Sequence, residues 1–311
     1  MEREDLFDKV EGYDKVCIQA PSGLKKEALD LSRDLKEKNK RTVIMSEPCF
    51  GACDLADRKA EFLGCDCLIH MGHSPFYKNG EKLNEEIPVF YLEKELDWDI
   101  SKVLRKEIEK IEEEKIGIVS TVQHLHKLQE TKKTLEDLGK KALIGDKGVR
   151  TQQKGQILGC DATSAGKIKE EVDAFLVLGS GKFHALRVLE TGKKVYRLDP
   201  MEERIEKLEP ERVEKEERKR ISKALKYKEE KTWGIIESTK KGQHHPEVVK
   251  NVKEKLESVG KEVFVMAGDR VLEEDLVDFG IKVWINTACP RLTDDFRQVA
   301  VINPDQIQYL E

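Results

Sequence analysis

The stretch "DKVCIQAPSG" at residues 14–23 begins a pattern that the chain repeats as "EKIGIVSTVQ" at residues 114–123 and "KTWGIIESTK" at residues 231–240. Each stretch is a short apolar, β-branched run that ends in small or polar residues, which is typical of a buried strand. An amphipathic helical pattern follows each run, at Leu24–Lys38, Leu125–Leu138 and Pro246–Val259. Residues that tolerate a left-handed helix end come next, namely Asn39, Gly139 and Gly260.

Three further apolar runs follow each helical pattern and predict the remaining strands. The second strands are predicted at "TVIMS" (42–46), "GQILG" (155–159) and "EVFVM" (262–266). The third are predicted at "CLIHMG" (67–72), "AFLVLG" (174–179) and "KVWINT" (282–287), and the fourth at "IPVFYL" (87–92), "KKVYRL" (193–198) and "QVAVIN" (298–303). Because strands that alternate with helices form βαβ units, the sequence predicts an α/β fold built from parallel sheets.

The repeat divides the chain into three predicted α/β units, at residues 1–105, 106–210 and 211–311. A period of this length is too long for a solenoid, so we expect the units to surround a common, pseudo-threefold centre. The segment at 201–231, between the second and third units, is dominated by charges of both signs, which predicts a solvated linking helix.

Composition argues against a nucleic-acid-binding, a secreted or a membrane-spanning protein. The 311 residues are 38% hydrophobic and 38% charged, with a net charge of only -5, so no global basic field favours direct nucleic-acid binding. The start, "MEREDLFDKV", lacks the apolar core of a signal peptide, and no run of about 18 apolar residues predicts a membrane span. We therefore expect a cytoplasmic protein, in which the seven cysteines are metal ligands, catalytic groups or core residues rather than disulfides.

Four of the cysteines occupy positions that favour a structural role or leave their role open. Cys17 lies inside a predicted strand and is interpreted as a small core residue. Cys65 and Cys67 lie at the start of a predicted strand, which is the wrong end of a parallel sheet for a ligand site. Cys49 accompanies Cys53 in a loop that follows a strand.

The other three cysteines, Cys53, Cys160 and Cys289, each follow a predicted strand, one in each unit. Ligands of parallel α/β sheets bind at this carboxyl edge, and three thiolates from three units can meet only at a shared centre. Soft thiolates favour zinc or an iron–sulfur cluster, and three of them leave one iron of a 4Fe-4S cluster without a protein ligand. On spacing alone, three unrelated structural cysteines remain an open alternative.

Three loops together resemble the signatures of a known family. The loops "EPCFGACDLAD" (47–57), "ILGCDAT" (157–163) and "ACPRLTDDF" (288–296) resemble those of archaeal 2-(3-amino-3-carboxypropyl)histidine synthases, enzymes of the first step of diphthamide biosynthesis. The resemblance covers nearly the whole chain. It implies that Cys53, Cys160 and Cys289 hold a 4Fe-4S cluster, that Cys49 is not a ligand, and that three Rossmann-like units form a triangle in each subunit of a homodimer.

The resemblance also implies an activity. Such a transferase uses S-adenosylmethionine and an electron donor to form an aminocarboxypropyl radical, which adds to C2 of a histidine imidazole in elongation factor 2. It is a noncanonical radical enzyme, and the compact C-x3-C-x2-C loop of ordinary radical enzymes is absent here, since no cysteine follows two residues after Cys53. No catalytic side chain beyond the cluster ligands is predicted.

The loops after equivalent strands are the candidates for binding S-adenosylmethionine. In "GSGKFHA", the residues Gly179, Ser180 and Gly181 offer backbone amides, and His184 is either a capping residue or a pocket residue. Arg291 is the best cationic partner for the carboxylate of S-adenosylmethionine. Gln123 and Gln243 are candidates to hydrogen-bond polar edges of this molecule. The competing interpretation is that these loops are simple turns and that the arginine pairs with a nearby acid.

Two other functions remain open from the sequence. A quinolinate synthase-like enzyme also has three α/β units and a three-cysteine cluster, which would act as a Lewis acid in a dehydrating condensation. A non-catalytic iron–sulfur partner subunit would keep the cluster of a paralogue reduced. The loops "GACDLAD" and "ACPRL" favour the diphthamide enzyme over the quinolinate synthase-like enzyme.

Overall fold

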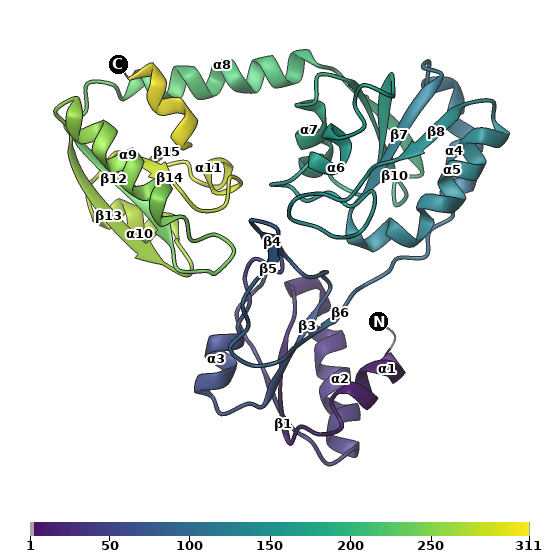
Figure 1. The fold of residues 1–311 in the computed structure, drawn as a ribbon. Helices are drawn as coiled ribbons and strands as arrows, with labels where there is room; N and C mark the ends of the chain where they lie inside the picture. The colour runs from purple at the N-terminus through teal and green to yellow at the C-terminus, as the bar shows by residue number, and fades with distance from the viewer. Residues whose placement is uncertain (1–2, 311) are drawn as a thin grey trace. The chain divides into compact units, whose positions relative to one another are not determined.

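The computed structural model of the protein describes residues 3–310, apart from the side chains of Arg212, Glu214, Glu216, Asp294 and Asp295. The chain divides into two compact units, Met1–Pro210 and Glu211–Glu311. Figure 1 labels helices and strands of both. Among the described residues, the first unit contains a four-stranded, a five-stranded and a small two-stranded sheet, and the second contains one four-stranded sheet. Each unit is described below by itself.

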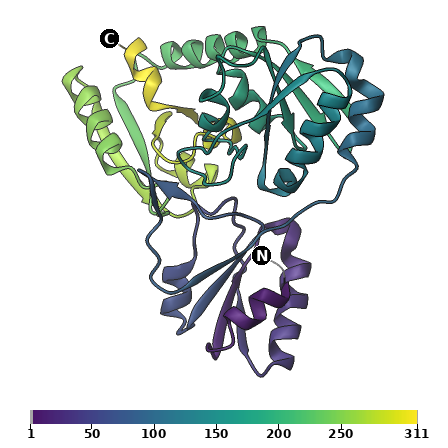
Figure 2. The same ribbon diagram turned by 45° about the vertical axis from the view of Figure 1, so that its right-hand side comes forward.

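The first sheet has the strand order β2-β1-β3-β6, with all neighbours parallel. Its strands are β1 (Lys15–Gln19), β2 (Arg41–Ile44), β3 (Cys67–Met71) and β6 (Val89–Leu92). Helices α1 (Arg3–Lys9) and α2 (Lys25–Glu37, after the 3-10 turn η1 at Ser22–Leu24) pack on one face, and α3 (Asp57–Phe62) packs on the other (Figure 2). A small antiparallel ribbon, β4 (Tyr77–Lys78) with β5 (Glu81–Lys82), follows β3.

The second sheet repeats this order as β8-β7-β9-β10 and adds β11 at its edge. Its strands are β7 (Lys115–Ser120), β8 (Lys141–Ile144), β9 (Ala174–Leu178), β10 (Lys194–Asp199) and the antiparallel β11 (Arg204–Leu208). One face is covered by α4 (Ile100–Glu107) and α5 (Leu128–Asp137), and the other by α6 (Thr163–Gly166) and α7 (Phe183–Leu189). Two 3-10 turns, η2 (Ile108–Lys110) and η3 (Val122–Lys127), complete the connections.

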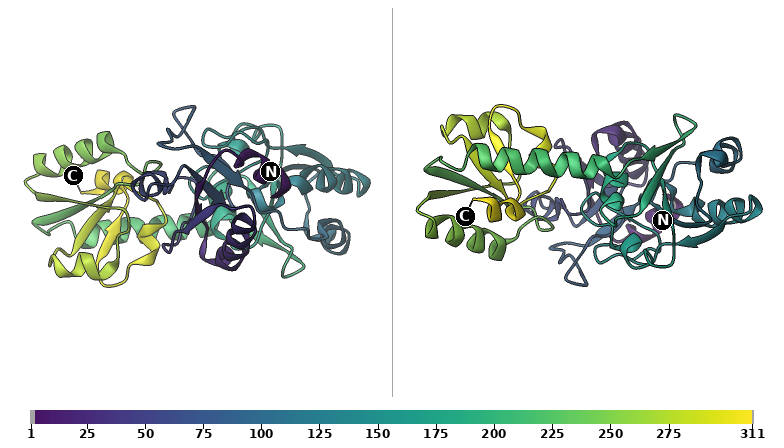
Figure 3. Two further views of the ribbon diagram at one scale, coloured as in Figure 1. Left: turned by 90° about the horizontal axis from the view of Figure 1, so that it is seen from below. Right: turned by 90° about the horizontal axis from the view of Figure 1, so that it is seen from above.

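The third sheet has the order β13-β12-β14-β15, again with parallel neighbours. Its strands are β12 (Thr232–Ser238), β13 (Glu262–Gly268), β14 (Val283–Asn286) and β15 (Ala300–Ile302). Helix α9 (Pro246–Ser258) packs on one face and α10 (Glu273–Asp278) on the other, which Figure 3 shows from two sides. The remaining helices are α8 (Glu211–Lys226), α11 (Leu292–Asp295) and the 3-10 turn η4 (Pro304–Tyr309).

The structure confirms an α/β fold of parallel sheets in which one strand order recurs. The predicted helix ends are also confirmed, since Asn39, Gly139 and Gly260 have φ of 60°, 83° and 80°. Side chains of α4 contribute to the core of the second sheet, so this core begins before residue 105. The three-unit division and its pseudo-threefold centre stay predictions.

The predicted second strand of the middle unit, "GQILG", is wrong. The place beside β7 is taken by β8 (Lys141–Ile144), because α5 ends at Asp137 and the turn at Gly139 delivers the chain directly into this position. The "GQILG" segment lies in the following loop, where Gly155 has φ of 74° and Ile157 N–H donates to the Ser120 carbonyl at 2.9 Å. Ile157 is buried there, which explains why the segment is apolar without being a strand.

The charged segment at 201–231 is only partly the predicted linking helix. Its first part forms β11, which pairs antiparallel with β10 and places Ile205 and Leu208 in the core. Helix α8 begins only at Glu211. Among the described helices, none is both long and apolar enough to cross a membrane.

Candidate functional site

The loop that carries Cys49 and Cys53 joins β2 to α3. Cys49 is buried, and Cys53 is partly exposed. A turn forms around Cys53, in which Asp54 N–H donates to the Gly51 carbonyl at 3.1 Å. A Cβ on Gly51 would lie only 3.3 Å from the Cys53 sulfur, so a glycine leaves space beside this thiol.

The amide side chain of Gln19, the last residue of β1, holds the backbone of this loop. Gln19 Nε2 donates to the Asp54 carbonyl at 2.7 Å, and Gln19 Oε1 accepts from the Ala56 N–H at 3.1 Å. The same oxygen lies 2.9 Å from Nδ1 of His70 on β3, whose Nε2 lies 3.0 Å from Nδ1 of His73. We did not predict Gln19, His70 or His73 as site residues, although a histidine within the apolar run "CLIHMG" was a usable signal.

Burial dominates the chemistry of the two histidines. It lowers the pKa of His70 to about 3, with a smaller contribution from the neighbouring His73. Burial also lowers the pKa of His73 to about 4. Both imidazoles are therefore neutral at physiological pH. The ligand atoms of Cys49, His70 and His73 lie within 4.8 Å of one another, a donor set of the type that zinc accepts.

The loop that carries Cys160 joins β8 to α6. Leu158 and Asp161 exchange two backbone hydrogen bonds, at 2.8 and 3.1 Å, and so close a tight turn that presents the partly exposed Cys160. The Asp161 carboxylate accepts from the backbone N–H groups of Arg150 at 2.8 Å and Thr163 at 2.9 Å. Asp161 therefore fixes the loop against the start of α6, as a capping residue does.

Cys53 and Cys160 come together at one place in the first unit. Both pack against the small apolar cluster of Ala52, Phe76 and Leu83. Further contacts join the loops around them: Tyr77 N–H donates to the Arg150 carbonyl at 3.1 Å, and the Arg150 guanidinium lies 5.6 Å from the centre of the Phe76 ring. The carboxyl edges of the first two sheets are thus linked by the Cys160 loop and the segment that follows β3, and Cys53 packs against the same cluster.

Cys289 lies in the second unit, in the loop between β14 and α11. The buried Asn286 shapes this loop, because its Nδ2 donates to the Cys289 carbonyl at 2.8 Å and its Oδ1 accepts from the Ala288 N–H at 3.0 Å. Cys289 is partly exposed. Arg291 is exposed and directly precedes α11.

The glycine loop at 179–182 connects β9 to α7. Gly181 has a backbone φ of 81°, a conformation that residues with a side chain rarely adopt. Ser180 Oγ donates to Asp199 Oδ1 at 3.3 Å, and Lys182 Nζ pairs with Glu206 at 2.5 Å. The loop therefore rests on the acidic side chains of β10 and β11.

A buried arginine organises those acids. Arg197 is only 2% exposed and contacts Asp199, Glu202 at 3.3 Å and Glu206 at 2.9 Å. Burial alone would lower the pKa of Arg197, but its bonds to Glu206 and Asp199 raise it above the ordinary value. Burial would raise the pKa of Asp199, but the Glu202 N–H and Arg197 hold it below its usual range. We did not predict this ion cluster, although the alternation of charged residues along β10 was a usable signal.

The remaining predicted residues have contacts of their own within their units. Gln123 Nε2 donates to the Gly72 carbonyl at 3.3 Å, so it joins two loops of the first unit. The ring of His184 lies 5.6 Å from that of Phe183, at the start of α7. Gln243 lies in the second unit, where its N–H donates to the Lys240 carbonyl at 2.9 Å.

Burial separates the other cysteines from this chemistry. It raises the pKa of Cys17 and Cys67 to about 12 and also raises the pKa of Cys65. These three thiols stay protonated at neutral pH, which suits core residues rather than thiolate ligands.

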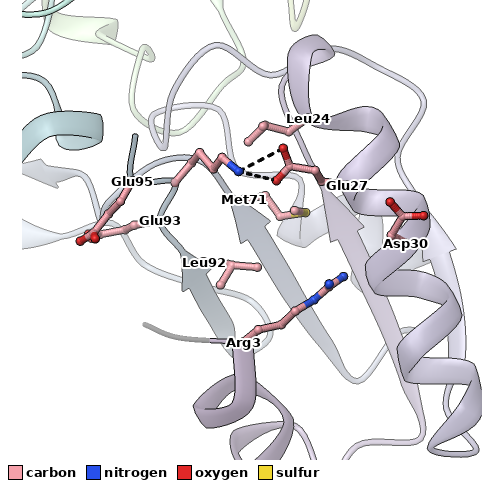
Figure 4. A pocket seen from close by; sticks show the side chains of 9 residues that line it. Arg3, Leu24, Glu27, Asp30, Met71, Leu92, Glu93 and Glu95 are labelled. Atoms are coloured by element: carbon pink, nitrogen blue, oxygen red, sulfur yellow. Dashed lines mark hydrogen bonds and ion pairs between the residues drawn. The ribbon is translucent and has the colours of Figure 1, made fainter. Parts of the chain in front are cut away.

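A hollow of about 360 Å³ lies elsewhere in the first unit, beside α1 and α2 (Figure 4). A salt bridge between Lys94 and Glu27 at 3.0 Å crosses it, and Arg3 on its wall pairs with Asp34 at 3.1 Å. Its lining contains no cysteine and no predicted site residue. The hollow therefore belongs to the opposite side of the first sheet from α3 and is not part of the cysteine site.

Comparison with known proteins gives the family. Residues 20–306 match the family of diphthamide synthesis proteins. The chain belongs to this diphthamide synthesis family. It is 34% identical over 305 residues to the 2-(3-amino-3-carboxypropyl)histidine synthase of Pyrococcus horikoshii, covering 96% of this chain and 86% of that protein. It is 30% identical over 315 residues to the enzyme of the same name from Methanocaldococcus jannaschii, covering 95% and 84%.

A solved structure of a diphthamide synthesis protein supports this membership. The crystal structure of Dph2 from Pyrococcus horikoshii with a 4Fe-4S cluster matches with a TM-score of 0.91 at 33% identity, covering all of this chain and 90% of that one. The resemblance that the three cysteine loops indicated is therefore confirmed at the level of the family.

Proposed function

We propose that this protein transfers the 3-amino-3-carboxypropyl group of S-adenosylmethionine to C2 of a histidine imidazole in elongation factor 2, the first step of diphthamide biosynthesis. The observation that carries the proposal is 34% identity over 96% of the chain to a synthase of that name. It is supported by the retention of the cysteine loops around Cys53, Cys160 and Cys289. Family membership argues against the quinolinate synthase-like alternative.

The residues in this chain fit a 4Fe-4S cluster. Cys53 and Cys160 are partly exposed thiols that pack against one apolar cluster, and Gly51 leaves space beside the Cys53 sulfur. Thiolates of this kind, in an apolar setting, are the ligands that iron–sulfur clusters use. We assign Cys53, Cys160 and Cys289 as the ligands, which leaves one iron position without a protein ligand. When bound, the cluster would supply the single electron that cleaves a carbon–sulfur bond of the sulfonium.

The chain's own residues then have to orient the cosubstrate, because the alignment of the sulfonium decides which bond breaks. We assign the methionine carboxylate to the backbone amides of Gly179–Gly181 and to Arg291. Ser180 is held by Asp199, and the Arg197 ion cluster stiffens the strands beneath, so this loop is preorganised. Gln123 and Gln243 are assigned to hydrogen-bond polar edges of the cosubstrate, and His184 is assigned to the same pocket.

The partners follow from the same proposal. The protein substrate is elongation factor 2, which presents a histidine, and a cytoplasmic electron donor reduces the cluster. The net charge of -5 gives little long-range steering, so we expect docking to depend on shape and local contacts. A homodimer is the proposed assembly.

The decisive experiment is anaerobic incubation of the reconstituted protein with dithionite and S-adenosylmethionine, with and without elongation factor 2. We expect methylthioadenosine in both samples, and one aminocarboxypropyl group on the target histidine of the factor. A mass gain that matches methyl or adenosyl would refute the transfer chemistry. Methylthioadenosine formation that depends on a second, paralogous chain would instead favour the non-catalytic partner subunit.

Single substitutions test the ligand assignment. Replacing Cys53, Cys160 or Cys289 with alanine should lower bound iron and sulfide. Cys17→Ala is the matched control and should retain both, because its thiol is a protonated core group. Loss of iron from Cys49→Ala together with full iron in Cys53→Ala would reverse the assignment of the first ligand.

A further inference from the structure

A chain of hydrogen bonds runs through the interior of the first unit beside the Cys53 loop. Gln19 is 5% exposed and His70 is fully buried, and each bonds to the other and to a further group. Gln19 on β1 and His70 on β3 are register partners in the parallel pair, so the sheet itself sets their contact. His73 extends the chain from the turn that follows β3.

The donors and acceptors of this chain can be assigned without ambiguity. The Asp54 carbonyl can only accept, and the Ala56 N–H can only donate, so the orientation of the Gln19 amide is fixed. Gln19 Oε1 must then accept from His70, which places the proton of His70 on Nδ1. His70 Nε2 carries a lone pair and accepts from His73, which places the proton of the neutral His73 on Nδ1 as well. His73 Nε2 is therefore the unprotonated ring nitrogen at the end of the chain.

At its other end, this chain of hydrogen bonds holds the backbone of the loop that carries Cys53. Asp54 is the next residue after Cys53, and Ala56 is three residues after it, so Gln19 holds the backbone immediately beyond the cysteine. The Gln19 amide is buried. If its two bonds to the loop were lost, the buried Ala56 N–H and the partly buried Asp54 carbonyl would lose these hydrogen bonds, which costs free energy of folding.

We propose that Gln19 and His70 are positioning residues for the Cys53 loop. They also hold His73 as its Nδ1–H tautomer, so that Nε2 of His73 is the last acceptor in this chain of hydrogen bonds. Calling the loop a ligand loop rests on the proposed function, but the relay itself does not. We define the relay as Gln19, His70 and His73.

The relay and a metal centre at the same residues exclude each other. Cys49, His70 and His73 have suitable ligand atoms within 4.8 Å. However, the His70 Nε2 lone pair already accepts the His73 proton, and a metal ion between these nitrogens would have to replace that hydrogen bond. The two arrangements also differ in protonation, because a metal-bound nitrogen carries no proton.

The first test needs no cluster. Amide hydrogen exchange of residues 49–56 should be about tenfold faster or more in Gln19→Leu than in wild type, because two hydrogen bonds to the loop are lost. Gln19→Glu keeps the acceptor for Ala56 and His70 but loses the donor to Asp54, so it should lie between the two. His126→Gln, at a partly exposed histidine outside the relay, is the matched control and should exchange like wild type. Equal exchange in wild type and Gln19→Leu would refute the positioning role.

Three further measurements separate the relay from a packing effect and from the proposed function. Nitrogen-15 shifts of the imidazoles should show Nδ1–H tautomers for His70 and His73, and an Nε2–H tautomer at either would overturn the assignment. Binding of one zinc ion per chain that is lost in Cys49→Ala would replace the relay by a metal centre. In reconstituted protein, iron loss to a chelator should be about tenfold faster in Gln19→Leu than in wild type. If wild type binds no iron, the proposed function fails while the exchange and tautomer results still decide the relay.

Discussion

Replacing Gly159 with alanine is the sharpest test of how the Cys160 loop is packed. A Cβ at this position would lie 1.7 Å from Cε1 of Phe183 and 2.5 Å from its Cδ1 and Cζ. Because carbon atoms in contact lie about 3.5–4.0 Å apart, the ring or the loop must move by roughly 2 Å. Gly159 directly precedes Cys160, and Phe183 begins α7 directly after the glycine loop, so a shift on either side disturbs a predicted site.

We expect Gly159→Ala to lower the free energy of unfolding of the first unit by about 1–3 kcal/mol, the usual cost of overpacking. Denaturant unfolding of the cluster-free protein measures this change, and iron content after reconstitution reports the effect on Cys160. Gly166→Ala is the matched control. A Cβ at Gly166 in α6 meets nothing within 4 Å, so we expect no loss and a gain of up to about 1 kcal/mol.

A second substitution identifies the clash as the cause. Removing the ring edge in Phe183→Leu should make Gly159→Ala less harmful, so the double-mutant cycle should show a favourable coupling of about 1 kcal/mol or more. Unchanged stability in Gly159→Ala, or an equal loss with and without Phe183, would show that the close approach of this glycine and this ring does not determine the loop.

Three other predictions follow from individual groups. Arg291→Met should weaken S-adenosylmethionine binding about ten- to a hundredfold, measured by titration calorimetry, while iron content stays intact; unchanged binding would remove the proposed role. Arg197→Met should destabilise the first unit by about 3–5 kcal/mol in denaturant unfolding, because the buried Asp199 carboxylate loses its partner; an effect below about 1 kcal/mol would contradict a buried ion pair. The free energy of unfolding should fall as pH drops from about 6.5 to 4, because the unfolded state protonates His70 and His73 while burial holds their folded pKa values at about 3 and 4. Each histidine contributes up to about 1.4 kcal/mol per pH unit to this dependence. A double His70→Gln, His73→Gln variant should lose that contribution.

Much of the fold could be predicted because its signals are local. Period-2 and period-3.6 patterns mark strands and helices, and residues such as Asn39 and Gly139 mark helix ends through their own backbone preferences. The same local reasoning failed for "GQILG", since Ile157 is buried by a loop and not by a strand. Apolar character reports burial, and this buried segment makes only one isolated parallel bridge, between Gln156 and Ser120, without becoming a strand of the sheet.

The cysteines show where sequence reasoning about the site ends. Position after a strand separated Cys53 from the core residue Cys17, because the direction of a parallel sheet decides which end carries a ligand site. Cys160 was placed by the same rule through the predicted strand "GQILG", which is a loop, so its strand is β8 (Lys141–Ile144) instead. Sequence could not show that Cys53 and Cys160 pack against the same apolar cluster, since this contact depends on how the loops of two sheets fold over each other.

The sequence by itself determined the strand and helix pattern, the repeat and the cysteine loops, because each is a property of neighbouring residues. Only the tertiary structure decided which buried polar groups bond to one another. Gln19 and His70 are 51 residues apart in the chain and meet because β1 pairs with β3 in one register. A shift of one residue in that register would turn their side chains to opposite faces of the sheet, so the relay exists only through strand pairing that no local pattern specifies.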